Sequence, residues 1–107
     1  EQKLVELNIP VTEHDKLPDI IILDGNDKRL YLFEAVTSHG PVTPKRLIEL
    51  ENRLKNCTLN KTYVTAFPDF VEFRKHITEI AWETDVWVVE VPDHIIHYNG
   101  RRHLDYK

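Results

Sequence analysis

The fold is decided by the sequence Pro-Asp-Ile-Ile-Ile-Leu-Asp at residues 18–24 and the sequence Leu-Tyr-Leu-Phe-Glu-Ala-Val at residues 30–36. Both stretches are short and rich in apolar residues, and Asp-Gly-Asn-Asp at residues 24–27 lies between them. Two such runs around a polar, glycine-containing stretch are typical of two β-strands joined by a hairpin loop. We therefore expect residues 19–36 to form a β-hairpin.

The register of this hairpin decides what its two acidic residues can do. If Leu23 pairs with Leu30 to close the loop, Asp19 falls opposite Glu34. Directly paired residues share one face of a sheet, with Cβ atoms roughly 4.5–5.5 Å apart. Two negative charges at that distance are destabilising unless a positive charge lies between them, and Mg²⁺ is a cation that favours carboxylate ligands. A slip of one residue would instead send the two acids to opposite faces.

The apolar run from Ile20 to Leu23 has a further implication. A continuous apolar strand is typical of a strand covered on both faces. We therefore expect this strand to be buried in the sheet, and the alternative is an edge hairpin whose two acids are both solvated.

Several stretches of the chain resemble a known family. The Pro18-Asp19 dipeptide and Glu34 in the next strand resemble the PD-(D/E)XK nuclease signature. The surrounding sequence is more specific and is similar to the BsuBI/PstI family of type II restriction endonucleases. The likeness runs from about residue 15 to the C-terminus, and the stretches that carry it are residues 17–22, 34–42, 44–46, 63–70, 79–84 and 92–97.

The resemblance implies a fold, an activity and partners. The fold would be an α/β fold with a central mixed β-sheet flanked by helices, the restriction-endonuclease-like (PD-(D/E)XK) core. The activity would be Mg²⁺-dependent hydrolysis of double-stranded DNA phosphodiesters, at a palindrome containing CTGCAG, by a homodimer. A cognate modification methyltransferase would act on the same site without binding this protein, and both would work in a prokaryotic cytoplasm.

The resemblance also implies a set of site residues. Asp19 and Glu34 would be catalytic metal ligands, and the backbone carbonyl of Ala35 would be a third ligand. The general signature places a lysine two residues after the glutamate, where this chain has Val36. Lys45 is our first candidate for that catalytic role, because it follows Glu34 by eleven residues. Lys61 and His39 are weaker substitutes.

Composition limits the possible classes of protein. The chain has 107 residues, of which 41% are hydrophobic and 30% are charged, and this is typical of one globular domain. Its one cysteine cannot form an internal disulfide, which favours a reducing cytoplasm. No apolar stretch has the length of a membrane span, so no membrane partner is expected. We interpret residues 1–107 as a single catalytic nuclease domain, from the C-terminal part of a longer enzyme.

The charge is distributed unevenly along the chain. The formal net charge is −4, but residues 35–66 contain five basic and two acidic residues. A positive stretch beside a metal site would suit a phosphate backbone, although a solvated helix face explains the same pattern. The candidate DNA contacts in this stretch are Ser38, His39, Lys45 and Arg46.

The remaining sequence predicts two helices with apolar faces. A first helix begins at Thr43-Pro44, an N-cap followed by proline at the first helical position, and presents Leu47, Leu50, Leu54 and Cys57 to the core. A second begins at Asp69 and presents Phe70, Phe73, Ile77 and Ile80.

Further strands and turns are expected around these helices. Strands are expected at residues 61–67 and 86–91, with a turn at Asn99-Gly100 between residues 95–98 and 101–104. Residues 1–8 are interpreted as the end of a helix, and residues 10–16 as a short strand.

Two other functions remain open at this point. The first is a catalytically silent DNA-binding or dimerisation module of the same fold, which Val36 favours. The second is a repair or mobile-element nuclease. The histidines could indicate zinc, but their spacing does not match the usual zinc patterns.

Overall fold

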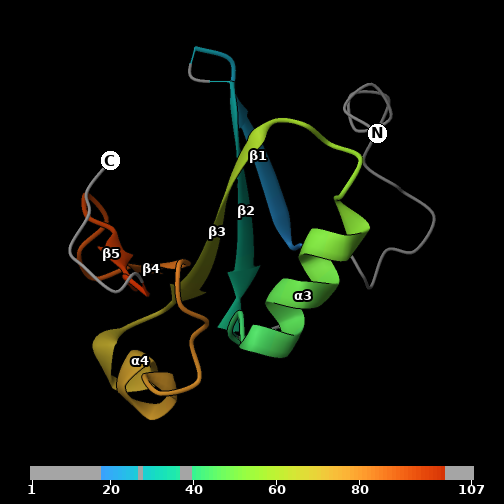
Figure 1. The fold of residues 1–107 in the computed structure, drawn as a ribbon. Helices are drawn as coiled ribbons and strands as arrows, with labels where there is room; N and C mark the ends of the chain where they lie inside the picture. Colours follow the sequence, from blue (N-terminus) through green and yellow to red (C-terminus); the bar gives the residue numbers. More distant parts are fainter. Residues whose placement is uncertain (1–17, 27, 37–39, 101–107) are drawn as a thin grey trace.

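The computed structural model describes residues 18–26, 28–36 and 40–100. Five strands form one mixed sheet in the order β1 (Ile20–Asp24), β2 (Arg29–Ala35), β3 (Asn60–Phe67), β4 (Asp85–Val88) and β5 (Ile96–His97). Helix α3 (Pro44–Arg53) connects β2 to β3, and helix α4 (Phe70–His76) connects β3 to β4 (Figure 1). Pairing is antiparallel for β1–β2 and β4–β5, and parallel for β2–β3 and β3–β4.

The β1–β2 hairpin has the register that the sequence predicts. Leu23 pairs with Leu30, and Ile20 pairs with Phe33. At the loop, the backbone N–H of Asn26 donates to Oδ1 of Asp24 at 3.0 Å, a local bond that favours a tight turn. Continuing this pairing by one residue brings Asp19 level with Glu34.

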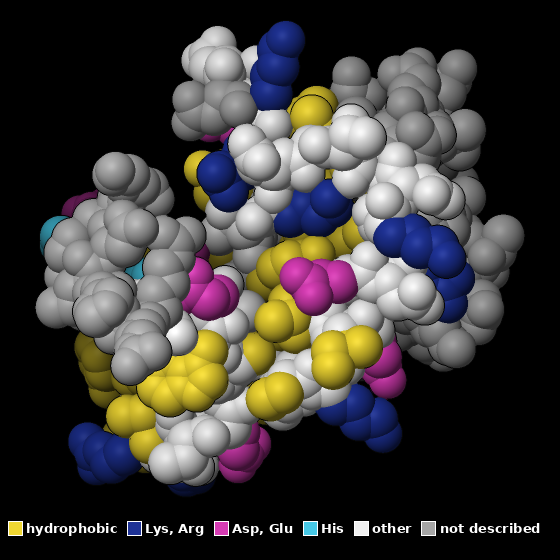
Figure 2. All heavy atoms as spheres, in the orientation of Figure 1, with side chains coloured by type: hydrophobic (Ala, Val, Ile, Leu, Met, Phe, Trp, Pro, Cys, Tyr) yellow, Lys and Arg dark blue, Asp and Glu magenta, His cyan; other side chains and the backbone are white. Residues whose placement is uncertain are grey.

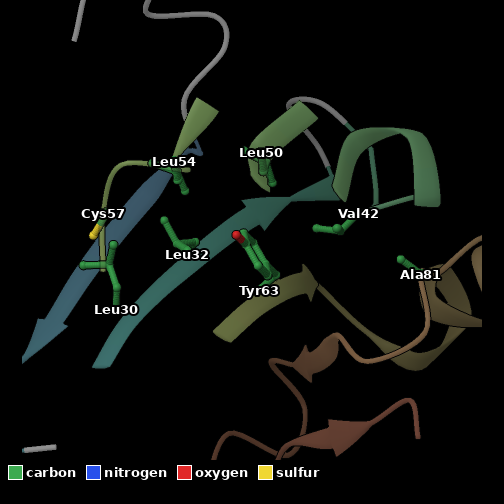
Figure 3. Packing of buried hydrophobic residues seen from close by; sticks show 8 residues of the cluster. All are labelled: Leu30, Leu32, Val42, Leu50, Leu54, Cys57, Tyr63 and Ala81. Atoms are coloured by element: carbon green, nitrogen blue, oxygen red, sulfur yellow. The ribbon is translucent and has the colours of Figure 1, made fainter. Parts of the chain in front are cut away.

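Helix α3 covers one face of the sheet. It begins as expected, because the Thr43 hydroxyl accepts a hydrogen bond from the N–H of Arg46 at 3.2 Å and Pro44 occupies the first turn. The expected apolar face of the helix is confirmed. Leu50, Leu54 and Cys57 are buried and Leu47 packs beside them, in a cluster with Leu30, Leu32, Val42, Tyr63 and Ala81 (Figure 3).

Helix α4 packs on the same face of the sheet, over a second apolar cluster. Phe73 lies against Phe67, with ring centroids 5.3 Å apart, and Val86, Val88 and Ile80 complete the cluster. Phe67 is four residues after Tyr63 on β3, so both clusters lie on one face.

The expected apolar face of the second helix is only half right. Phe73 and Ile80 are buried, but Phe70 and Ile77 are 36% and 46% exposed. Helix α4 ends at His76, so Ile77 and Ile80 lie beyond it and the helical spacing does not govern them. The strand expected at residues 86–91 is likewise shorter, because β4 ends at Val88.

The expectation that the strand of residues 20–23 is covered on both faces is wrong. Strand β1 is at the edge of the sheet, and its Ile20 and Ile22 side chains are 53% and 48% exposed. Only Ile21 and Leu23 pack on the core. The continuous apolar run arises because the outer face of β1 borders an apolar groove, which is lined in part by Ile20, Ile22 and Phe33.

Three expected elements cannot be compared with the structure. The helix end at residues 1–8, the strand at 10–16 and the second half of the hairpin at 101–104 lie outside the described residues. No helix within the described ranges is long and apolar enough to cross a membrane.

Candidate nuclease site

The site is built around Glu34, a carboxylate on the buried face of β2. Along this strand Leu30, Leu32 and Glu34 alternate toward α3, and all three are almost fully buried. An ionised carboxylate in such surroundings requires a charged partner and hydrogen bonds. Arg46 supplies both. Its Nε lies 2.7 Å from Oε2 of Glu34, and its Nη2 lies 3.2 Å from Oε1.

Arg46 is held in place by the start of α3. It lies in the first turn, where its own N–H bonds to the Thr43 cap, and its side chain is only 15% exposed. The loop before the helix is fixed to the sheet, because the N–H of Val42 donates to Oγ1 of Thr65 at 2.9 Å. Thr65 pairs with Glu34 in the β2–β3 ladder. The same segment of sheet therefore positions both members of the ion pair.

The surroundings of Arg46 stabilise its charged form. Burial by itself would lower the pKa of Arg46. The hydrogen bonds and the negative charge of Glu34, with a further contribution from Glu49, outweigh burial and raise this pKa above its ordinary value. The guanidinium therefore remains a permanent positive charge next to Glu34.

Asp19 lies at the same end of the hairpin but in different surroundings. It is exposed, in a bend just before β1, and its Oδ2 accepts a hydrogen bond from the N–H of Ala35 at 2.8 Å. Ala35 directly follows Glu34. The hairpin thus brings Asp19 beside Ala35, and a direct approach of the Asp19 and Glu34 carboxylates on one face stays a prediction. Asp19 also borders the apolar groove, whereas Glu34 is buried under α3.

The candidate ligands are of a chemical type that suits Mg²⁺. Two carboxylates and the backbone carbonyl of Ala35 are hard oxygen ligands of the kind this ion favours. In the described conformation the positive partner of Glu34 is the Arg46 guanidinium, and both carboxylate oxygens are bound to it. Each oxygen keeps a second lone pair, but Glu34 is almost fully buried, so an ion reaches it only if its surroundings move. Across residues 18–26, 28–36 and 40–100, no group of three or more acidic, histidine or cysteine side chains is arranged to hold a metal ion.

The other candidate residues have separate positions. Lys45 is exposed in the first turn of α3, beside Arg46. Lys61 is already bound, because its Nζ donates to the carbonyls of Cys57 at 2.6 Å and Leu59 at 3.0 Å. Ser38 and His39 lie outside the described residues.

Part of the basic stretch of residues 35–66 is engaged within the protein. Two of its cations, Arg46 and Lys61, bond within the protein. In the orientation of Figure 2, lysine and arginine side chains lie in several separate groups, with hydrophobic and acidic side chains between them.

The sequence interpretation missed the role of Arg46 as the partner of Glu34 and named it only as a candidate DNA contact. One signal could have identified it. A glutamate on the apolar side of an alternating strand requires a nearby cation, and the first cations after Glu34 are Lys45 and Arg46.

The mixed sheet with helices, and a pair of acids at the end of its hairpin, define the restriction-endonuclease-like α/β class. A search of solved structures supports this, because the SdaI restriction endonuclease superposes with a TM-score of 0.83 and 34% identity, over 96% of this chain and 32% of that one.

The family follows from sequence comparison. The model of the BsuBI/PstI restriction endonuclease domain matches residues 1–101, so the chain belongs to this family. It is 43% identical over 104 residues to the type II restriction enzyme BsuBI of Bacillus subtilis, covering 97% of this chain and 33% of that protein. It is 36% identical over 91 residues to the type II restriction enzyme AplI of Arthrospira platensis, covering 85% and 28%. The chain therefore spans about a third of the length of these relatives.

Proposed function

We propose that residues 1–107 form the catalytic domain of a type II restriction endonuclease that hydrolyses phosphodiesters of double-stranded DNA with Mg²⁺. The observation that supports the proposal is that the hairpin bonds Asp19 to Ala35, the residue after Glu34, in a chain of a restriction endonuclease family. The named relatives BsuBI and AplI are type II restriction enzymes. This supports the same class of reaction here.

The proposed chemistry assigns a task to each residue. Asp19, Glu34 and the carbonyl of Ala35 would hold Mg²⁺, which activates water and stabilises negative charge on a phosphate when it is bound. Lys45 would take the place of the lysine that Val36 replaces, by stabilising charge on the scissile phosphate. Its position in the turn that also carries Arg46 supports this assignment, since Arg46 contacts Glu34 directly.

The wider setting is also part of the proposal. The enzyme would act in a prokaryotic cytoplasm as a homodimer on a palindrome containing CTGCAG, protected by a cognate methyltransferase. A repair or mobile-element nuclease would lack that methyltransferase, so an adjacent methyltransferase gene distinguishes the two settings.

One observation favours a second candidate, a catalytically silent module. Val36 stands in the position of the signature lysine, and Arg46 binds both oxygens of Glu34. A buried ion pair of this kind also occurs where no metal binds.

A cleavage assay with the full protein decides between enzyme and module. Parent, Asp19→Ala and the control Glu51→Ala, which removes an exposed acid of α3, are incubated with plasmid carrying CTGCAG, with Mg²⁺ or with chelator. We expect Mg²⁺-dependent cleavage by the parent and the control, and a rate at least about 10²-fold lower for Asp19→Ala, the scale of losing one electrostatic element of a site. DNA binding without any cleavage by the parent would favour the silent module.

A further inference from the structure

Both oxygens of the Glu34 carboxylate are hydrogen-bonded in the described state. Each of its oxygens accepts a hydrogen bond from a different nitrogen of Arg46, and Glu34 is 0% exposed. Two-point pairing of this kind is both strong and geometrically specific. Each oxygen keeps a second lone pair, but the carboxylate is shielded from solvent, so an ion that binds it must shift the groups around it, including the charged Arg46.

Arg46 has a second carboxylate within reach. Its Nη1, the nitrogen that Glu34 does not use, lies 3.5 Å from Oε1 of Glu49, three residues further along α3. The Glu49 side chain is 53% exposed, whereas that of Glu34 is 1% exposed. Arg46 can therefore loosen one contact with Glu34 and keep an anionic partner at the solvent side of the helix.

From this geometry we propose that Arg46 is a positioning residue that holds the Glu34 carboxylate when metal is absent and yields part of it to the ion when metal binds. Glu49 then becomes the larger partner of Arg46. This inference rests on the proposed metal role of Glu34. It goes further by naming Arg46 and Glu49 as the residues that set the affinity for the ion.

The purely structural alternative makes a different prediction. If the ion pair only stabilises the packing of α3 on β2, Arg46 variants lose stability while metal affinity stays the same. A competing guanidinium instead lowers metal affinity through its two-point contact as well as its charge. Because removing any nearby positive charge raises cation affinity, the charge-retaining variant Arg46→Lys separates the two roles.

The test is a metal titration that does not depend on catalysis. Chelator-treated parent, Arg46→Gln and Arg46→Lys are titrated with Mg²⁺ or Mn²⁺ by calorimetry, at constant ionic strength and without DNA. Arg46→Gln removes hydrogen bonds to the charged Glu34, and such bonds are strong. We therefore expect the dissociation constant of Arg46→Gln for the metal to fall by roughly tenfold or more. Arg46→Lys keeps the charge but not the two-point geometry, so a smaller fall is expected. The control Lys55→Gln removes an exposed cation just after α3 and should leave the constant within about twofold.

Glu49→Gln provides a second variant in case Arg46→Gln fails to fold with a buried unpaired Glu34. Glu49 is exposed, so its replacement leaves the core intact. Without this second partner Arg46 remains more firmly on Glu34, and the dissociation constant should rise several-fold. Glu51→Gln removes another exposed acid of α3 and controls for the general loss of negative charge.

The outcomes separate this inference from the proposed function. Tighter binding in the Arg46 variants and weaker binding in Glu49→Gln than in Glu51→Gln would support it. A second outcome is that Asp19→Ala loses metal binding while parent, Arg46→Lys and Glu49→Gln have equal dissociation constants. That outcome would overturn the role of Arg46 alone. If the parent binds no metal, or if Asp19→Ala does not change its metal binding, both proposals are overturned.

Discussion

Arg46 and Glu34 form a two-point ion pair between the first turn of α3 and the buried face of β2, with N–O distances of 2.7 and 3.2 Å. The pair explains how a carboxylate can lie among the leucines of this strand. It also supplies the positive charge that a buried Glu34 requires. A buried pair contributes little net stability compared with apolar residues, but breaking it leaves an uncompensated charge.

Replacing Glu34 by alanine should therefore destabilise the domain as well as remove a proposed ligand. The Arg46 guanidinium would lose its main partner in a largely buried position, a change that costs about 3–5 kcal/mol. Urea titration of the metal-free protein measures the effect. The matched control is Glu51→Ala on the exposed side of α3, which should change stability by no more than about 0.5 kcal/mol. A loss below about 1 kcal/mol for Glu34→Ala would contradict the ion pair as described.

Lys45→Ala should lower the cleavage rate more than it lowers DNA affinity. Lys45 lies one residue before Arg46, in the helical turn that contacts Glu34, so its proposed task is to stabilise charge at the phosphate. Single-turnover rates at saturating enzyme isolate the chemical step from binding.

A contact with the DNA backbone alone would give a different pattern for Lys45→Ala. Binding would weaken, and the slope of its salt dependence would fall by about one unit. Equal single-turnover rates for variant and parent would therefore exclude the catalytic role. Lys55→Ala, at an exposed position just beyond α3, is the control for general loss of charge.

Phe73→Ala and Phe70→Ala should lower the free energy of unfolding by different amounts, although the two residues lie in the same helix. Phe73 is 9% exposed and packs on Phe67, so its truncation leaves a cavity and should cost about 3–5 kcal/mol. Phe70 is 36% exposed and should cost about 1 kcal/mol, the typical value for a point substitution. Denaturant titration of both variants compares them directly, and equal losses would mean that Phe70 is part of the core.

Stability should fall at high pH because of Tyr63. Burial, with smaller contributions from Glu51 and Cys57, raises the pKa of Tyr63 to about 12 in the folded protein. In the unfolded chain the pKa is about 10, so above pH 10 the folded state binds more protons than the unfolded state. The contribution of Tyr63 is therefore fully present below pH 10 and is lost between about pH 10 and 12.

The variant Tyr63→Phe tests the pH prediction. It lacks the titrating hydroxyl, so it should keep the stability that the parent loses between about pH 10 and 12. Over this pH interval the unfolding free energy of the parent should fall by about 1–3 kcal/mol relative to that of the variant. Melting curves of both proteins from about pH 8 to 12 measure the shift. Parallel curves for the two proteins would assign the alkaline loss to other groups.

Much of the local structure could be predicted from sequence because neighbouring residues decide it. The polar loop between two apolar runs fixed the hairpin, and pairing of Leu23 with Leu30 then fixed every other pair. The Thr43-Pro44 start and the apolar face of α3 were also predictable, since a cap and a helical period are properties of short stretches.

Other features could not be predicted, because they depend on segments far apart in the chain. An apolar run such as residues 20–23 is compatible with a central strand and with an edge strand that borders a groove. Only the strand order places β1 at the edge. The end of α4 at His76 could not be predicted either, because the apolar residues continue at helical spacing past it to Ile80.

The sequence by itself determined that this chain forms a hairpin with Asp19 level with Glu34, and that it resembles one family of nucleases. Only the tertiary structure decided that Glu34 is buried and that Arg46, not the adjacent Lys45, neutralises it. The physical reason is that backbone pairing is set by the turn and the alternation of the strands themselves. The partner of a buried charge is set by where the crossover helix packs, and that position depends on the whole core.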